Sequence, residues 1–322
     1  MSTHRFTTLA VATLLAGGCE NVHSKLDDVP HTMPAEKDTA STAGAATTPV
    51  PALGANAGVE ERLARVEAQL RKYEEPLEFL AKVYAQQKQQ QQAQERDEPA
   101  PDAVFAVDVA NDIAIGQVDG PATAPVTIVK AFDFACPYCQ KVAGTMDELV
   151  KDYGGKVRVV YKNMVVHPQV AQIVHLASCA AAKQGKYLQF KNAFWDKGFG
   201  GYAASGGKDH SAYTDEGIAK IAGEVGLDTG KLKADMAGDE CKKLVENDMQ
   251  ELAKFKVNST PTFFINGQHV GGALPKDAFK QIIDEKLKIA EASGVSGADY
   301  YAKEVVGKGE KQFRSKMDPK PN

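Results

Sequence analysis

The chain has 322 residues, of which 43% are apolar and 25% are charged, and its formal net charge is −4 at pH 7. This composition is that of an ordinary soluble globular protein of one or two domains. No basic patch offers itself to nucleic acid or to an anionic membrane surface, so we expect neither as a direct binding partner.

The N-terminal part of the chain predicts an exported, lipid-anchored protein. Residues 1–18 contain a short apolar run behind a positively charged residue, and this run is too short to span a bilayer. Together with Cys19 it resembles a bacterial lipoprotein signal peptide, although the favoured leucine lies one place early. We expect cleavage before Cys19 and lipidation of its thiol; the alternative is an ordinary secretory signal or a poorly structured N-terminus. Residues 19–57 lack hydrophobic periodicity, which indicates a flexible tether.

A heptad pattern follows the tether and predicts a long N-terminal helix over residues 58–98. Its apolar residues are spaced alternately four and three apart: Val59, Leu63, Val66, Leu70, Tyr73, Leu77, Leu80 and Tyr84. The pattern favours a parallel homodimer in which Arg62 faces Glu67 of the second chain; the alternative is a helix packed on its own domain. Pro76 predicts a break or kink near Glu75, because an interior proline costs about 3 kcal/mol or more.

The most informative motif is Cys136-Pro137-Tyr138-Cys139, which stands where a strand leads into a helix. Residues 126–134 form an apolar run rich in β-branched residues, and the residues after Cys139 show helical spacing. Unpaired N–H groups and the positive end of a helix dipole stabilise a thiolate there, lowering a cysteine pKa from about 8.5 to roughly 3.5–7. Cys136 is therefore the expected nucleophile, and Cys139 is placed to attack a mixed disulfide and release the partner.

Further strands and helices are expected on both sides of this motif. The predicted elements are an edge strand at 105–109, a central strand at 156–165, helices across 168–255 with a Gly/Ser-rich loop at 198–207, a hairpin around Asn266-Gly267, and a closing helix at 276–289. Phe190, Phe194 and Trp195 lie at helical spacing and are expected in the core.

The C-P-Y-C motif and the downstream segment VNSTPTFFINGQHVGG, residues 257–272, together resemble the DsbA-like branch of the thioredoxin superfamily. The resemblance covers roughly residues 107–291. It implies an α/β fold in which a thioredoxin domain at 99–292 carries a helical insertion at about 168–256. The long helix would precede this domain, and a tail, residues 293–322, would follow it.

The resemblance also implies which residues bind the substrate. The peptide bond before Pro261 would be cis and would face the cysteine pair. Thr260 would offer its backbone to an incoming extended peptide and its hydroxyl to the sulfur atoms. We expect Pro137 and Tyr138 to contribute to the same binding surface.

Lys130 departs from the resembled family, in which the position six residues before the first cysteine normally carries a buried acid that helps to move the proton of the second thiol. A lysine near the cysteines would lower their pKa and make the disulfide a stronger oxidant. Alternatively, Lys130 turns outward and Asp133 supplies the acid, or Lys130 only extends to solvent. The sequence leaves these three interpretations open.

The remaining cysteines predict a structural disulfide. If Cys19 is lipidated, four cysteines are left, which pair without remainder and fit an oxidising compartment. A bond between Cys179 and Cys241 would close a loop of 62 residues and stabilise the fold by roughly 4 kcal/mol. A metal site that adds His175 to these two cysteines lacks an evident fourth ligand. A zinc or iron–sulfur site at the C-P-Y-C motif would need a second ligand pair, so we expect no metal and no cofactor.

These features predict an enzyme: a periplasmic or cell-envelope thiol–disulfide oxidoreductase that acts on cysteines of exported proteins and exchanges electrons with a membrane redox partner. Thr260 and a dimer favour an isomerase, whereas Lys130 favours an oxidase. A hypothesis from a different class is a non-catalytic peptide-binding or chaperone lipoprotein that uses the thioredoxin groove. His167 is expected to be a structural histidine.

Overall fold

A computed structural model describes residues 58–320. The expected signal peptide, the tether and Cys19 lie outside the described residues. The chain divides into two compact units, Met1–Lys72 and Tyr73–Asn322, and the second contains the strands and all helices after α1. Within residues 58–320, no helix has both the length and the apolar composition needed to cross a membrane.

Helix α1 (Val59–Asp97) contains the whole heptad pattern. It continues through Pro76, so of the break or kink predicted near Glu75 the break is wrong. A proline removes one hydrogen bond of a helix, and the bonds on either side are enough to hold the helical path here. The eight apolar side chains of the pattern expose between 49% and 82% of their surface.

The sheet has five strands in the order β1-β3-β2-β4-β5. The strands are β1 (Val118–Asp119), β2 (Val126–Phe132), β3 (Val157–Asn163), β4 (Thr262–Ile265) and β5 (Gln268–Gly271). Strands β2 and β3 are parallel, and the pairs β2–β4, β4–β5 and β1–β3 are antiparallel. Every residue of β2 and β3 is buried, as expected for central strands covered by helices on both faces.

The turn between β4 and β5 is the hairpin predicted from Asn266-Gly267. Both residues have positive φ, 42° and 85°, as a type I′ turn requires. Asn266 also accepts a hydrogen bond from the Thr127 main-chain N–H at 2.8 Å and donates one to the Pro125 carbonyl at 3.0 Å. The turn residues thus select the hairpin and also fasten it to the start of β2.

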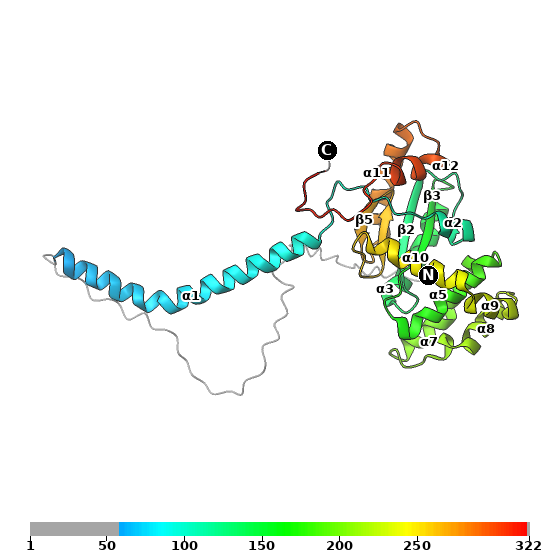
Figure 1. Cartoon of the computed structure of the whole chain (residues 1–322), viewed down its shortest axis with the longest axis horizontal. Helices are drawn as coiled ribbons and strands as arrows, with labels where there is room; N and C mark the ends of the chain where they lie inside the picture. The colour runs from blue at the N-terminus through cyan, green and yellow to red at the C-terminus, as the bar shows by residue number, and fades with distance from the viewer. Residues whose placement is uncertain (1–57, 321–322) are drawn as a thin grey trace, which may run out of the picture. The chain divides into compact units, whose positions relative to one another are not determined.

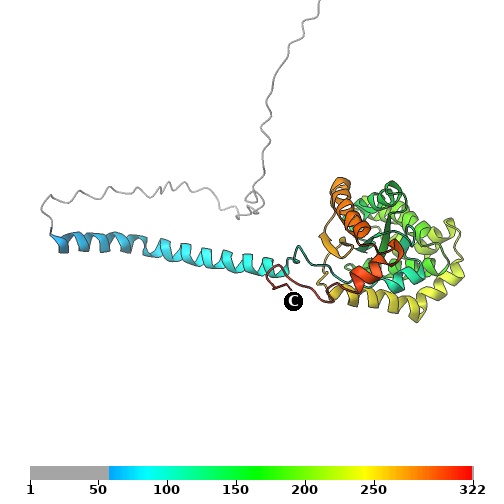
Figure 2. The same cartoon turned by 90° about the horizontal axis from the view of Figure 1, so that it is seen from above.

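A helical insertion separates β3 from β4, as the resemblance implied. It consists of α5 (Pro168–Lys183), α6 (Tyr187–Ala193), the π-helix η1 (Phe194–Gly198), α7 (Phe199–Ala204), the 3-10 turn η2 (Ser211–Tyr213), α8 (Asp215–Glu224), α9 (Thr229–Ala237) and α10 (Asp239–Ala253). In Figures 1 and 2 the green to yellow-green helices of the insertion gather at one side of the domain, away from α11 (Lys276–Ala292) in orange.

Part of the loop predicted at 198–207 is helical, so that prediction is wrong for α7. The glycines there suggested a loop, but Phe199 is buried, and its ring centroid lies 5.6 Å from that of Trp195. Burial of this aromatic side chain outweighs the low helix propensity of the neighbouring glycines.

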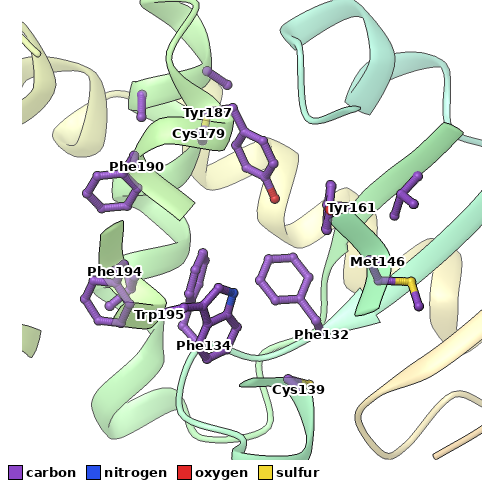
Figure 3. Close-up of a cluster of buried hydrophobic side chains, with 14 of the residues drawn as sticks. Phe132, Phe134, Cys139, Met146, Tyr161, Cys179, Tyr187, Phe190, Phe194 and Trp195 are labelled. Atoms are coloured by element: carbon purple, nitrogen blue, oxygen red, sulfur yellow. The ribbon is translucent and has the colours of Figure 1, made fainter. Parts of the chain in front are cut away.

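Aromatic side chains join the insertion to the sheet. The ring centroid of Phe132 at the end of β2 lies 4.9 Å from that of Phe134 and 5.9 Å from that of Tyr161 on β3. Phe134 in turn packs against Phe194 and Trp195, which are in the core as predicted. Figure 3 shows Phe132 between Tyr161 and this aromatic group, with Cys139 at the edge of the cluster. The cysteine motif is thus attached to a rigid core.

The opposite face of the sheet is covered by the two ends of the domain. Phe105 is buried there and stacks on Phe313, with ring centroids 6.0 Å apart. Tyr301 donates a hydrogen bond to the carbonyl of Val107 at 2.8 Å. The predicted edge strand at 105–109 is wrong, because Phe105 forms only an isolated bridge with Glu310 and belongs to no strand of the sheet.

The segment predicted as a tail contains α12 (Gly297–Tyr300) and the π-helix η3 (Tyr301–Val306), whose Tyr300, Tyr301 and Val305 are buried. These residues belong to the core, so a domain that ends at residue 292 lacks part of its own packing.

Candidate active site

The C-P-Y-C motif lies between β2 and two short helices, α3 (Pro137–Lys141) and α4 (Ala143–Asp152). Cys136 is the N-cap residue of α3, and Pro137 occupies its first turn, where a missing N–H leaves no acceptor unsatisfied. One continuous helix was expected here; the helix instead breaks at Val142, whose φ and ψ are −100° and 4°. Cys139 therefore belongs to a short separate helix of five residues, Pro137–Lys141.

Cys136 sits in surroundings that favour its thiolate. The side-chain hydrogen bond from the Cys139 thiol lowers the pKa of Cys136 to about 5, helped by the Thr260 side chain and by the main-chain N–H groups of Cys139 and Tyr138, although burial opposes the shift. The residue keeps 5% of its surface exposed. A thiolate of this kind is populated at neutral pH and remains in reach of a partner sulfur.

Cys139 is shifted in the opposite direction. It is completely buried, and burial, followed by the hydrogen bond that it gives to Cys136, raises its pKa far above the ordinary thiol value. The positive charge of Lys130 opposes part of this shift. One thiol is thus ionised and accessible, and the other is protonated and enclosed.

The second segment of the site is Thr260-Pro261, which precedes β4. Its peptide bond is cis, as the resemblance implied. The Thr260 carbonyl oxygen lies 3.3 Å from Cys136 Sγ. The buried Thr260 hydroxyl lies close enough to Cys136 to help lower its pKa, although it makes no hydrogen bond of good geometry with a described residue. Tyr138 exposes 62% of its surface beside the nucleophile. The structure thus brings Thr260 to the cysteine motif.

Asp133 stabilises the loops around the motif. One of its carboxylate oxygens accepts from the Ala135 N–H at 2.7 Å, and the other accepts from the N–H groups of Val166 and His167 at 2.7 and 3.0 Å. His167 Nδ1 lies 3.1 Å from the same carboxylate, so His167 has the structural role that was predicted. Both oxygens of Asp133 are occupied in holding the chain.

Lys130 lies on β2 and is only 1% exposed, so the interpretation in which it extends to solvent is wrong. Its Nζ donates to the main-chain carbonyl of Cys139 at 3.3 Å. Burial lowers the pKa of Lys130 to about 8, while the Cys139 thiolate, when it forms, acts in the opposite direction. A lysine with this pKa can exchange a proton close to neutral pH.

Cys179 and Cys241 form a disulfide between α5 and α10, with Cα atoms 5.6 Å apart. The metal site considered for these residues is therefore wrong, because disulfide sulfurs carry no thiolate for a metal. His175, on the same helix as Cys179, instead pairs through Nδ1 with the Asn163 side-chain oxygen at 2.8 Å. Among residues 58–320, no three His, Cys, Asp or Glu side chains converge as metal ligands.

The sequence analysis missed two buried lysines near the site. Lys191 Nζ donates to the Tyr161 hydroxyl at 2.9 Å and to Asp147 at 3.0 Å. Lys162 Nζ donates to Asp112 and Asp248, each at 2.7 Å. The sequence did offer a signal for Lys162, because a lysine inside an apolar strand needs buried carboxylates to compensate its charge.

Comparisons with known proteins identify the family. A family model described as thioredoxin matches residues 108–285, which is more than half of the chain. The chain belongs to the thioredoxin family. A thioredoxin-like oxidoreductase from Silicibacter pomeroyi DSS-3 is 29% identical, with a TM-score of 0.47 over 53% of this chain and 91% of that one. BdbD from Bacillus subtilis is 21% identical, with a TM-score of 0.49 over 59% of this chain and 99% of that one.

Curated relatives are longer proteins. The Na(+)/H(+) antiporter NhaA of Herminiimonas arsenicoxydans is 28% identical over 181 residues, which are 56% of this chain and 27% of that protein. Na(+)/H(+) antiporter NhaA 3 of Salinispora tropica is 32% identical over 166 residues, which are 48% of this chain and 22% of that protein. The chain therefore spans about a quarter of the length of these relatives.

Proposed function

We propose that this protein is a thiol–disulfide oxidoreductase that exchanges disulfides with cysteines of exported proteins through Cys136 and Cys139. The observation that carries the proposal is the placement of the two cysteines: Cys136 caps the first turn of α3 and its Sγ lies 3.3 Å from the Thr260 carbonyl oxygen, while Cys139 is fully buried within the same turn. The pKa of Cys136 is lowered to about 5, so this thiol is ionised at neutral pH, while burial keeps Cys139 protonated. A cysteine pair of this kind has a defined order of reaction, because only one thiol is nucleophilic at the start.

In the reducing direction, the Cys136 thiolate attacks one sulfur of a substrate disulfide, forms a mixed disulfide and releases a substrate thiolate. Cys139 then loses its proton and attacks Sγ of Cys136, which breaks the mixed disulfide and releases the second substrate thiolate. The substrate gains two electrons, and the cysteine pair becomes a disulfide. In the oxidising direction each bond change runs in reverse, and Cys139 regains its proton.

Thr260 and Pro261 form the proposed wall for an extended substrate peptide. The backbone of Thr260 already reaches Cys136 through its carbonyl oxygen. A peptide that pairs with this backbone as an added strand would carry its own cysteine toward Cys136. Tyr138 is exposed at the other side of the thiolate and, with Pro137, would contact the same peptide.

The proposed location is the cell envelope, with a lipid anchor at Cys19 and a membrane redox partner that resets the cysteine pair. The Cys179–Cys241 disulfide supports an oxidising compartment, because such bonds rarely persist in the cytosol. We propose in addition that α1 pairs with α1 of a second copy, since its apolar seam is uncovered over the whole helix.

The test is to trap the mixed disulfide. The Cys139→Ser variant, mixed with an unfolded protein that contains disulfides, should accumulate a covalent complex that a reductant dissolves, and Cys136→Ser should form none. A chaperone or binding lipoprotein, the alternative function, would protect the unfolded protein equally well with Cys136→Ser. That outcome, without any covalent complex from Cys139→Ser, would overturn the proposal.

The direction of exchange follows from the redox potential. Equilibration of the wild-type protein with mixtures of reduced and oxidised glutathione gives this potential directly. A value near that of the strong periplasmic oxidants would assign an oxidase, and a value near that of thioredoxin would assign a reductase.

A further inference from the structure

Lys130 is a buried lysine that forms no ion pair with a carboxylate among residues 58–320. Its side chain is enclosed in the core on the face of β2 that also bears Phe132, and its ammonium group contacts the Cys139 carbonyl at 3.3 Å. The other two lysines that are equally enclosed, Lys162 and Lys191, both form ion pairs with aspartates. Leaving a charge in the core uncompensated costs several kcal/mol, so an unpaired lysine here is unfavourable as a purely structural element.

Each element packed against Lys130 presents a known set of polar groups. Helix α3 presents Cys139 and, at its start, Cys136. Helix α4 presents Asp147, helix α6 presents Lys191, and β3 places Tyr161 directly opposite Lys130. On the other side β4 contributes Phe263, which is apolar. The group that most favours the charged form of Lys130 is thus the Cys139 thiolate, at the moment when it forms, rather than a carboxylate.

The proposed exchange requires a proton acceptor at Cys139. Its thiol is protonated in the resting reduced state, is fully buried, and must become a thiolate before it attacks. Water has little access to it. Asp133, the other candidate near the motif, holds main-chain N–H groups with both carboxylate oxygens. Lys130 is bonded to the main chain of the same cysteine, and the charges of Lys130 and of a Cys139 thiolate act on each other's pKa, so Nζ lies near this sulfur.

We propose that Lys130 is the acid–base residue of the buried thiol, taking the proton of Cys139 when it attacks and returning it when it leaves. This inference rests on the proposed function. In the reducing direction, the neutral amine accepts the proton while the new bond to Sγ of Cys136 forms and the substrate departs as a thiolate. In the oxidising direction, a substrate thiolate attacks Sγ of Cys136, the bond to Cys139 breaks, and the ammonium of Lys130 protonates the released thiolate.

The pKa of about 8 suits this role, because a group that titrates near the working pH can both accept and donate a proton. Burial sets this value, and the charges of Lys191 and Asp147 adjust it in opposite directions. Substitution of Lys191 or of Asp147 should therefore shift the pKa of Lys130 while the lysine itself stays in place.

Reaction of the reduced protein with 5,5′-dithiobis(2-nitrobenzoate) separates the two steps. Attack by Cys136 releases a first equivalent of coloured thionitrobenzoate, and resolution by Cys139 releases a second. In the wild type the second rate should rise with pH and level off above about 8. In Lys130→Met the second rate should fall by about 10²-fold at that pH and rise with hydroxide without levelling off. The first rate should be unchanged.

Asp147→Asn and Lys191→Met are matched variants that keep Lys130. Asp147→Asn should move the midpoint of the second rate to lower pH, and Lys191→Met should move it to higher pH. If Lys130→Met keeps the wild-type second rate and its midpoint, the acid–base role is wrong, while a normal first equivalent leaves the proposed function intact. If no first equivalent appears, the proposed function fails instead.

A measurement on the wild type covers the case in which Lys130→Met does not fold. Nuclear magnetic resonance of isotope-labelled lysine side chains should show one lysine that titrates near pH 8 in the reduced protein. A Lys130 signal that remains that of an ammonium group well above pH 8 would overturn the proposal, because no neutral amine would then be available to accept the proton.

Discussion

The Sγ atom of Cys136 lies 3.3 Å from the main-chain oxygen of Thr260, a residue 124 positions later in the chain. The two residues lie next to different strands: Cys136 follows β2, and Thr260 precedes β4, on the far side of the helical insertion in the sequence. Strands β2 and β4 are direct neighbours, so their pairing fixes this contact. The pairing of these two central strands thereby brings the sulfur of Cys136 and the backbone of Thr260 together.

The pH dependence of Cys136 follows from its lowered pKa. A thiol whose pKa falls to about 5 stays ionised as the pH is lowered from neutral and becomes protonated only below that value. The rate of alkylation by iodoacetamide should therefore be constant at neutral pH and fall with a midpoint of about 5. In Cys139→Ala the midpoint should move upward, because the Cys139 thiol makes the largest contribution to the shift. An unchanged midpoint in that variant would contradict the assigned cause.

The Thr260 hydroxyl gives a second, separable contribution to the same thiolate. Thr260→Val preserves the shape of the side chain and removes the hydroxyl, so the midpoint for Cys136 alkylation should rise above about 5. Thr262→Val is the matched control, because its hydroxyl bonds the Ser259 carbonyl at 2.8 Å and does not contribute to the pKa of Cys136. Equal shifts in the two variants would show that the effect comes from the loop and not from the hydroxyl.

The sequence was sufficient for features that depend on local rules. The turn chemistry of Asn266-Gly267 predicted the hairpin, and the apolar β-branched runs predicted both central strands. The pairing of Cys179 with Cys241 followed from cysteine number alone, and the structure contains that bond. The resemblance to the DsbA-like branch, carried by two separated motifs, supplied the order of strands and insertion.

The remaining features depend on contacts between distant residues. Phe105 forms no strand because its partner segment, near Glu310, offers a single bridge, and no local pattern records that. The C-terminal segment is rich in charge, yet its Phe313 and Tyr301 belong to the apolar cluster around Phe105 that covers one face of the sheet. The burial of Lys130 was also out of reach of the sequence, since an inward and an outward lysine on a strand look identical.

The buried ion pairs of Lys162 should make Asp248 important for stability. Asp248 accepts from Lys162 Nζ at 2.7 Å and from the Asn163 side chain at 2.7 Å. Asp248→Ala leaves these donors buried with too few acceptors and should lower the free energy of unfolding by about 3–5 kcal/mol, as measured by urea denaturation. Glu246→Ala, at an exposed position of the same helix, should change it by less than about 0.5 kcal/mol. Similar losses in both variants would contradict the role of the ion pairs.

The Cys179–Cys241 disulfide should contribute stability without taking part in exchange. It closes a loop of 62 residues, for which chain entropy gives roughly 4 kcal/mol. Cys179→Ala together with Cys241→Ala should lower the free energy of unfolding by about 2–5 kcal/mol. The release of both thionitrobenzoate equivalents should keep its wild-type rates under conditions in which the double variant is folded. A loss of the first equivalent would show that this disulfide belongs to the reactive system.

The apolar seam of α1 provides the last prediction, which concerns the oligomeric state. Leucines at Leu70 and Leu77 occupy one repeating position of the heptad and are both more than half exposed in the single chain. In a parallel pair of helices each would meet its own copy, so Leu70→Glu with Leu77→Glu would place like charges in the seam.

Sedimentation equilibrium should give a dimer for the soluble wild-type chain without its lipid. It should give a monomer for the double glutamate variant and for a chain that begins at Asp102. Lys72→Glu changes a charge outside the seam and should leave the dimer intact. Glutamate is a good helix former, so the double variant keeps α1 helical, and circular dichroism verifies this. If the wild-type chain and the shortened chain are both monomers, the pairing of α1 is wrong.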